Sequence, residues 1–229
     1  MSEYSNDFAH ILTTTRSVRK RLDFAREVNV SIVDECLSMA LQAPTGGHAE
    51  DWRWIVVSDI EMKKKLGHIY LDNFIKYVRT PMLSSGPSNE LVKGRLGGVK
   101  SGEVDSRTAR MLEGAEYLAE NIHRSPFLVI PCASRPNPEF GGSGTISAVY
   151  GSIYPAVWSF QLALRSKGLG SVITSLHLHS AEEVAKLLSI PEGITQVAML
   201  PVAYTIGTDF KVAARKSVDE VRFINGWSQ

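Results

Sequence analysis

This sequence of 229 residues has few cysteines, almost no excess of one charge and no long apolar run. Its two cysteines, Cys36 and Cys132, have neither CxxC nor metal-ligand spacing and cannot staple a chain of this length. Lysine and arginine total 25 against 24 acidic residues, a balance that disfavours a general nucleic-acid surface. No window approaches the roughly 20 apolar residues of a membrane span, and the N-terminus lacks the pattern of an export signal. We therefore expect a cytoplasmic protein that binds neither nucleic acid nor membrane.

The signatures of three common kinds of site are also missing. The glycine-rich stretches match neither the dinucleotide fingerprint nor the phosphate loop, and no GxSxG elbow anchors a hydrolase triad. His177 and His179 would face the same side of a strand, but no third ligand stands nearby, so we expect no metal site.

The chain has the composition of a globular protein, with 44% apolar residues, and we expect one domain that covers residues 1–229. Runs of β-branched and aromatic residues predict buried strands at 52–57, 126–133 and 195–204, and a short strand at 171–174. The order of helices and strands is not a regular βαβ repeat, which favours an α+β fold.

Helix starts are indicated by two capping-box spacings. Ser31 with Asp34, and Ser180 with Glu183, each have the spacing of a capping residue and its partner. A third helix, apolar nearly all round, is predicted from about 148 to 166. Such a helix needs cover on several sides, either from its own core or from a partner subunit.

The stretch TRSVRKR, which begins at residue 15, gathers four cations in a chain that is otherwise balanced in charge. Arg16, Ser17 and Arg19 offer two guanidiniums around one hydroxyl, a donor set that suits a phosphate monoester. Lys20 and Arg21 are interpreted as solvated surface charges.

Four further segments accompany this stretch along the chain. They are APTGGHAEDW, YPAVWSFQLALRSKGLG with VITS after it, MLPVAYTIG, and the segment AARKSVDEVRFINGW near the C-terminus. Together the five segments resemble the FMN-dependent nitroreductase family. The resemblance implies a three-layer α/β/α sandwich with a central mixed, mainly antiparallel sheet. It also implies an intertwined homodimer with the flavin site at the subunit interface.

Residue by residue, the resemblance assigns roles around FMN. Arg16, Ser17 and Arg215 would hold its phosphate or ribityl side, and Arg19 would reach the pyrimidine end of the ring. The remaining assigned residues would lie along the flavin or at its N5 and O4 edge, namely Pro44, Thr45, His48, Ile173, Thr174 and Ser175. No catalytic side chain is implied, because flavin N5 itself carries the hydride, with Thr174 and Ser175 near it.

Two parts of the family pattern are altered. The usual first arginine of the basic motif is Thr15, which removes one possible phosphate ligand. The usual asparagine of the second motif is His48, and Glu50, Asp51 and Trp52 replace its final QPW. A GxH in this position also occurs in the branch of the family that dehalogenates iodotyrosine. The Glu, Tyr and Lys substrate clamp of that branch is not recognisable in the variable insertion at 81–106.

The function that the resemblance implies is FMN-dependent reduction of small electrophiles, such as nitroaromatics, quinones and enones. NADH or NADPH would reduce the flavin first and the small-molecule acceptor would follow, in ping-pong order. The alternatives are a substrate-specific flavin dehydrogenase or dehalogenase, with 81–106 as a lid, and a protein that binds FMN without turnover. The choice among NADH, NADPH and a deazaflavin donor stays open.

Overall fold

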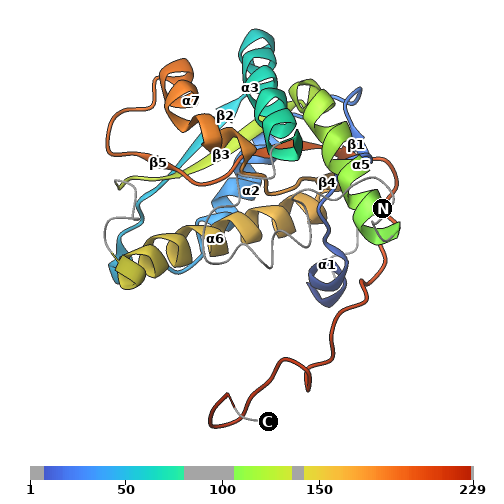
Figure 1. The fold of residues 1–229 in the computed structure, drawn as a ribbon, viewed down its shortest axis with the longest axis vertical. Coiled ribbons are helices and arrows are strands. Elements are labelled where there is room, and N and C mark those ends of the chain that lie inside the picture. The colour runs from blue at the N-terminus through green and yellow to red at the C-terminus, as the bar shows by residue number, and fades with distance from the viewer. Residues whose placement is uncertain (1–7, 80–105, 136–141, 228–229) are drawn as a thin grey trace.

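A computed structural model describes residues 8–79, 106–135 and 142–227. Within these ranges, helices cover both faces of an antiparallel sheet, so that the molecule has three layers (Figure 1). The strands in sequence order are β1 (Leu22–Asp23), β2 (Trp52–Val57), β3 (Phe127–Ala133), β4 (Leu169–Gly170), β5 (Thr195–Gln196) and β6 (Leu200–Thr205). The main order across the sheet is β1-β6-β3-β2, while β4 pairs with β6 and β5 pairs with β3. The α+β prediction with a mainly antiparallel sheet is confirmed.

Each face of the sheet carries its own core. The helices are α1 (Phe8–Thr14), α2 (Val30–Ala40), α3 (Ile60–Arg79), α5 (Ser106–Asn121), α6 (Gly142–Ser166) and α7 (Ala181–Leu188). One core joins α3, α5 and α7 to the sheet through side chains such as Leu66, Leu118 and Val184. The other joins α2 and α6 to it through side chains such as Val33 and Phe160. Burying apolar side chains on both faces is the main force that fixes the three layers.

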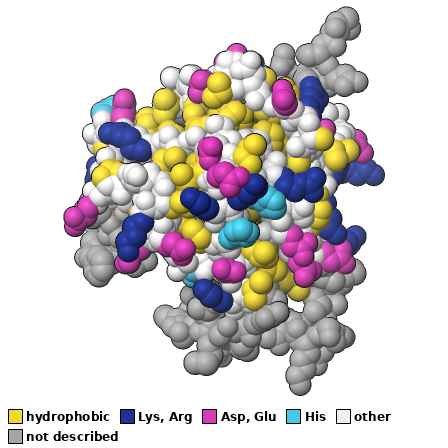
Figure 2. Space-filling view, turned by 90° about the horizontal axis from the view of Figure 1, so that it is seen from above, with side chains coloured by type: hydrophobic (Ala, Val, Ile, Leu, Met, Phe, Trp, Pro, Cys, Tyr) yellow, Lys and Arg dark blue, Asp and Glu magenta, His cyan; other side chains and the backbone are white. Residues whose placement is uncertain are grey.

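The outer surface of the α3, α5 and α7 layer is mixed in charge. Figure 2 shows acidic and basic side chains interspersed over this face, without a broad patch of one sign. In the described part of the chain, no helix is long and apolar enough to cross a membrane.

The predicted strands differ in burial according to their place in the sheet. Every residue of β3 is buried, because the strand is paired on both sides. The strand at 52–57 forms as β2, but only Val57 in it is buried, so the prediction of a buried strand is wrong there. Among the described strands β2 pairs only with β3, and it therefore lies at an edge.

Two predicted helix starts and one predicted capping hydrogen bond need correction. The cap of α2 is Asn29, whose side chain accepts a hydrogen bond from the Ser31 N–H at 2.9 Å, so Ser31 lies inside the helix. The helix α7 begins where expected, but Ser180 makes no capping hydrogen bond, because its hydroxyl is paired with Asn73 of α3. The helix α6 starts at Gly142, six residues before the predicted start.

The segment after β4 is irregular. Instead of a strand at 171–174, Ser171 and Thr174 each form an isolated bridge, with Ser17 and Met199 respectively. His177 and His179 follow in a 3-10 helix, η4 (Leu176–Ser180), where His177 is buried and His179 is exposed. They do not share a face, and no group of metal-binding side chains occurs among the described residues.

Candidate functional site

The basic motif is joined to the segment after β4 by the backbone. The Val18 N–H donates to the Ser171 carbonyl at 3.0 Å, and Ser17 forms a parallel bridge with Ser171. The Ser171 hydroxyl in turn accepts from the Gln161 side chain on α6 at 2.9 Å. Val18 is 4% exposed and anchors the motif in the core, while Ser17 faces outward. Residues 16–19 and 171–175, far apart in the sequence, therefore lie side by side.

Arg19 is a half-buried cation without an acidic partner. It takes part in none of the ion pairs found among the described residues. Burial lowers the pKa of its guanidinium, against a smaller opposing effect from Tyr70. Since an arginine stays protonated even so, the site holds an uncompensated positive charge that suits an electron-rich ligand.

Arg16 is partly engaged by its own chain. Its guanidinium donates to the carbonyls of Thr15, Thr13 and Lys211. A guanidinium has five N–H donors, and two of them remain for a ligand. Lys211 lies only four residues before Arg215, so Arg16 is held against the beginning of the segment that carries Arg215. Arg215 itself is exposed.

The other two cations of the motif, Lys20 and Arg21, each pair with a protein group. The interpretation as a solvated surface charge is wrong for Arg21, which is half-buried. Lys20 is exposed, as expected, and pairs with Glu113 at 3.0 Å. Arg21 is half-buried, pairs with Asp209 at 2.6 Å and stacks on the Phe210 ring at 4.2 Å. The sequence pattern misses this because the two partners of Arg21 stand 188 and 189 positions later.

The residues from Ile173 to Ser175 differ in which of their polar groups are already hydrogen-bonded within the protein. Both backbone polar groups of Thr174 are occupied, since its N–H donates to Met199 at 3.1 Å and its carbonyl accepts from Met199 at 2.8 Å. Its hydroxyl lies 2.6 Å from the Tyr70 hydroxyl. The N–H groups of Ile173 and Ser175 make no hydrogen bond within the described part of the chain, and both residues are exposed. They remain available as donors to a ligand.

The second motif forms a loop against the first half of α6. It contains a 3-10 turn, η1 (Gly46–His48), in which Gly47 and His48 have φ values of 63° and 53°. The Gly46 N–H donates to the Ser152 hydroxyl at 3.0 Å, and the Trp52 indole donates to the Ser152 carbonyl at 3.1 Å. Pro44 and His48 are exposed and Thr45 is half-buried. A positive φ in a non-glycine residue is strained, and such strain occurs often at binding sites.

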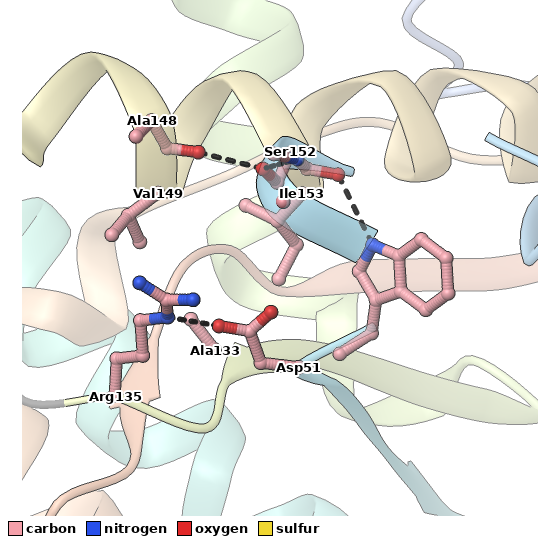
Figure 3. A pocket seen from close by; sticks show the side chains of 10 residues that line it. Asp51, Ala133, Arg135, Ala148, Val149, Ser152 and Ile153 are labelled. Atoms are coloured by element: carbon pink, nitrogen blue, oxygen red, sulfur yellow. Dashed lines mark hydrogen bonds and ion pairs between the residues drawn. The ribbon is translucent and has the colours of Figure 1, made fainter. Parts of the chain in front are cut away.

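A pocket of about 390 Å³ lies beside this loop. Figure 3 shows Val149 and Ile153 of α6 on one side, and Asp51 and Arg135 pointing toward each other on the other. The two charged residues form an ion pair, and the Ser134 N–H donates to the Asp51 carbonyl at 2.7 Å. This pairing ties the end of the loop to the end of β3.

The assigned residues therefore fall into two groups at different places along α6. The first, Arg16 to Arg19 with Ile173 to Ser175, is attached to Gln161 through Ser171, and the second, Pro44 to His48, is attached at Ser152. These two points are nine positions apart on the helix, a rise of about 13.5 Å. In Figure 1 the loop with η1 lies near the start of α6, while α1 and the basic motif lie toward its other end.

Sequence reasoning missed the residues that support the site. Tyr70, Ser152 and Gln161 belong to helices whose pattern indicates packing. Tyr70 and Ser152 each bond to a residue of an assigned motif, and Gln161 bonds to Ser171, which pairs with the basic motif. The signal that could have found Gln161 is a polar side chain in an otherwise apolar helix, because a buried amide requires a partner.

The nitroreductase family model matches residues 12–204 of this chain. The chain belongs to the nitroreductase family. Its match covers both assigned motifs and the segment after β4, so the recognition made from the five sequence segments is confirmed.

Several known proteins resemble the chain in sequence or in fold. Rat iodotyrosine deiodinase 1 is 25% identical over 95% of this chain and 69% of its own length, and the Drosophila melanogaster iodotyrosine deiodinase is 24% identical over 84% and 61%. A BluB-like flavoprotein from Clostridium difficile has a TM-score of 0.67 at 14% identity, covering 96% of this chain and 99% of that one. An iodotyrosine deiodinase bound to FMN and 3-iodo-L-tyrosine has a TM-score of 0.64 at 20% identity, covering 96% and 98%. These identities establish the common fold, and they leave the reaction to be argued from the site.

Proposed function

We propose that the chain binds FMN and is an oxidoreductase that transfers electrons from NADH or NADPH to small electrophiles. The observation that carries this proposal is Arg19, a half-buried guanidinium without an acidic partner in the described chain. Beside it the chain offers the exposed Ser17 hydroxyl and the free N–H groups of Ile173 and Ser175. Membership of a family with FMN-bound structures supports the same reading.

The donor set fits the parts of FMN. Arg16 retains two N–H donors and, with Ser17 and Arg215, would hold the phosphate through charge-assisted hydrogen bonds. Arg19 would face the pyrimidine end, where its charge favours the electron-rich reduced form. Pro44, Thr45 and His48 would lie along the ring. Thr15 contributes no ligand, because its hydroxyl is already bonded to the Ile11 carbonyl at 2.6 Å.

When bound, FMN supplies hydride chemistry at N5, with the nicotinamide donor first and then a nitroaromatic, quinone or enone as acceptor. The residues of the chain bind and orient, and none is required as a general acid or base. Thr174 and Ser175 would set the environment of N5. The proposed location is the cytoplasm.

We further propose a homodimer in which each flavin site combines the two groups of assigned residues from different subunits. The two groups lie at different places along α6, which supports a site completed by a second copy. The exposed apolar surface supports it as well, since Trp158 on α6 is 39% exposed and Trp227 at the end of the tail is 84% exposed. Apolar surface of this kind is typical of a protein interface.

Dehalogenation of a halogenated phenol is the second candidate. It is favoured by the match to the rat and fly iodotyrosine deiodinases over most of this chain and by the GxH in the second motif. If the protein binds FMN without turnover, it would convert neither small electrophiles nor halogenated phenols. If the electron donor is a deazaflavin, NADH and NADPH would not reduce the flavin, although the small electrophiles would still be reduced with the deazaflavin present.

The absorption spectrum of the purified protein tests the cofactor, and anaerobic titration with NADH and NADPH tests the donor. We expect yellow protein whose flavin absorbance is bleached by one of the nucleotides and restored by menadione or a nitrofuran. Reduction by dithionite, followed by reoxidation with 3-iodo-L-tyrosine but not with menadione, would select the dehalogenase. Colourless protein that binds no added FMN would contradict the proposal as a whole.

A further inference from the structure

The C-terminal tail begins with a short stretch, residues 206–211, that is held against the body of the chain. The Ile206 N–H donates to the Arg21 carbonyl at 2.9 Å, and the Arg21 guanidinium donates to the Ile206 carbonyl at 2.7 Å. The Arg165 guanidinium, in the last turn of α6, donates to the Thr208 carbonyl at 2.9 Å. In Figure 1 the chain beyond this stretch extends away from the body. Residues 206–211 therefore form an anchor for the tail.

Phe210 is the side chain of this anchor that both arginines contact. Its ring centroid lies 4.2 Å from the guanidinium carbon of Arg21 and 4.9 Å from that of Arg165. The ring is half-buried and packs against the core between α3, α5 and the sheet. Arg165 is only 8% exposed and forms no ion pair within the described part of the chain. Because the face of an aromatic ring attracts a guanidinium, most strongly away from water, Phe210 stabilises both charges and is held by them.

Arg16 connects this anchor to the predicted phosphate site. Its guanidinium donates to the carbonyl of Lys211, the residue directly after Phe210. Residues 212–216 make no hydrogen bond or ion pair within the described part of the chain, so Lys211 is the last residue before Arg215 that is hydrogen-bonded to the body. Four residues of extended chain span at most about 14 Å. An anchored Lys211 therefore keeps Arg215 in the neighbourhood of Arg16.

We propose that Phe210 is a positioning residue that, through its two arginine contacts, keeps Arg215 within reach of the FMN phosphate. The inference rests on the proposed function, which assigns Arg16 and Arg215 to that phosphate. A tethered group acts as though it were present at high local concentration, and the gain depends on the length and freedom of the tether. With the ring in place, the tether is the four residues after Lys211. Without it, Lys211 is held less firmly, and Arg215 spends less time at the phosphate.

Removing the ring changes the anchor without removing any of its hydrogen bonds. Phe210→Leu keeps an apolar side chain against the core. The three backbone carbonyls that accept from arginines belong to other residues, namely Ile206, Thr208 and Lys211, and they keep their donors. The loss is therefore confined to the two contacts between the ring and the guanidiniums. FMN affinity should fall about fivefold, which is less than the loss expected in Arg215→Ala.

The test is a double-mutant cycle of Phe210→Leu with Arg215→Ala, in which the full-length proteins are titrated with FMN and quenching of flavin fluorescence gives the affinity. If the ring acts through Arg215, Phe210→Leu loses affinity in the wild type and nothing further in the Arg215→Ala background. Riboflavin, which lacks the phosphate, is titrated in parallel, and its affinity should be the same with and without the ring. Phe24→Leu is the matched control, because Phe24 packs against the same core with the Arg124 guanidinium 5.4 Å from its ring. We expect no change of FMN affinity in this control.

An unchanged FMN affinity in Phe210→Leu would overturn the inference. The same fall in the Arg215→Ala background, or an equal fall for riboflavin, would overturn it as well, because the ring would then act on something other than Arg215 and the phosphate. If Phe210→Leu does not fold, site-specific Phe210→pentafluorophenylalanine replaces it. This ring keeps nearly the same shape, but its faces no longer attract a cation, and the same fall is expected. A wild-type protein that binds no FMN would instead contradict the proposed function, and the inference with it.

Discussion

The two groups of assigned residues are held by different means. The group of Arg16 to Arg19 with Ile173 to Ser175 is anchored by backbone bonds between Val18 and Ser171 and between Thr174 and Met199. The group of Pro44 to His48 lies at the surface and is attached to α6 through Ser152. The first is an extension of the core, whereas the second is a loop with positive φ values that few contacts support.

This difference indicates that the first group is ready to bind within one chain and the second depends on further contacts. A loop whose backbone is strained stays in place only where its surroundings over-determine it. A second copy packed on α6 would supply those surroundings. The variants below are chosen to affect one group and spare the other, beginning with the largest expected effect.

Loss of the phosphate ligands should have the largest effect. The double variant Arg16→Ala/Arg215→Ala removes two charge-assisted hydrogen-bonding groups, each worth about 1.5–3 kcal/mol. FMN affinity, measured by quenching of flavin fluorescence, should fall by at least about 100-fold. Arg222→Ala is the matched control on the same tail, because Arg222 pairs locally with Asp219. Retention of stoichiometric FMN by the double variant would show that the phosphate ligands are misassigned.

A charge on the exposed side of α6 should prevent dimerisation. The two groups of a shared site would then no longer meet. In Trp158→Glu an unpaired carboxylate would be buried in the proposed interface, at a cost of about 3–5 kcal/mol. Sedimentation should then show a monomer that binds FMN weakly. Ile60→Glu places the same charge on α3, where Ile60 is 64% exposed, and should leave the assembly unchanged. A stable FMN-loaded monomer in the wild type would rule out the shared site.

Lowering the pH should lower the folding stability around the first group of assigned residues, because His177 becomes protonated. Burial lowers the pKa of His177 to about 4, with a smaller effect from His179, so the folded state holds the imidazole neutral. The unfolded chain binds this proton more readily between pH 4 and about 6.5, and stability therefore falls as the pH is lowered through that window. The loss attributable to this group is about 3 kcal/mol between pH 7 and pH 4. Urea unfolding should show a flatter profile in His177→Leu and, because the effect of His179 on His177 is the smaller one, only a slightly flatter profile in His179→Gln.

The smallest effect is expected from the attachment of the loop. Ser152→Ala removes the acceptor for the Gly46 N–H, a loss of about 1 kcal/mol that should weaken FMN binding about fivefold. Ser38→Ala is the control, because Ser38 and Ser152 both donate to the carbonyl four residues earlier in a helix. An equal change in the two variants would mean that the Gly46 contact does not support the site.

The sequence predicts where the helices and strands lie better than it predicts their burial and their side-chain partners. The apolar run at 52–57 predicts the strand correctly, but its burial depends on the neighbours of β2 in the sheet, which a local pattern does not contain. The Ser180 spacing predicts the start of α7, whereas the use of its hydroxyl depends on Asn73, 107 residues away. Arg21 likewise has its partner 188 residues later. Contacts between distant segments decide each of these cases.

In the candidate site, too, local motifs identify some residues, and only contacts between distant segments identify the others. The motifs locate Arg16, Ser17, Arg19 and the residues after β4 in the sequence, and the fold brings these together. Tyr70 and Ser152 are absent from any motif, because their role comes from a single contact across the structure. The proposed lid at 81–106 falls outside the described residues except for Ser106, the first residue of α5.

The central claim is that one flavin site combines both groups of residues from two copies of the chain. Its most direct test is FMN stoichiometry in a heterodimer of Arg16→Ala/Arg19→Ala with Thr45→Trp, co-expressed with two different tags and purified on both. A shared site leaves one intact pair of groups per heterodimer, so we predict one FMN for two chains, although each variant alone binds none. A heterodimer without FMN would contradict the claim, because it would place both groups of one site within a single chain.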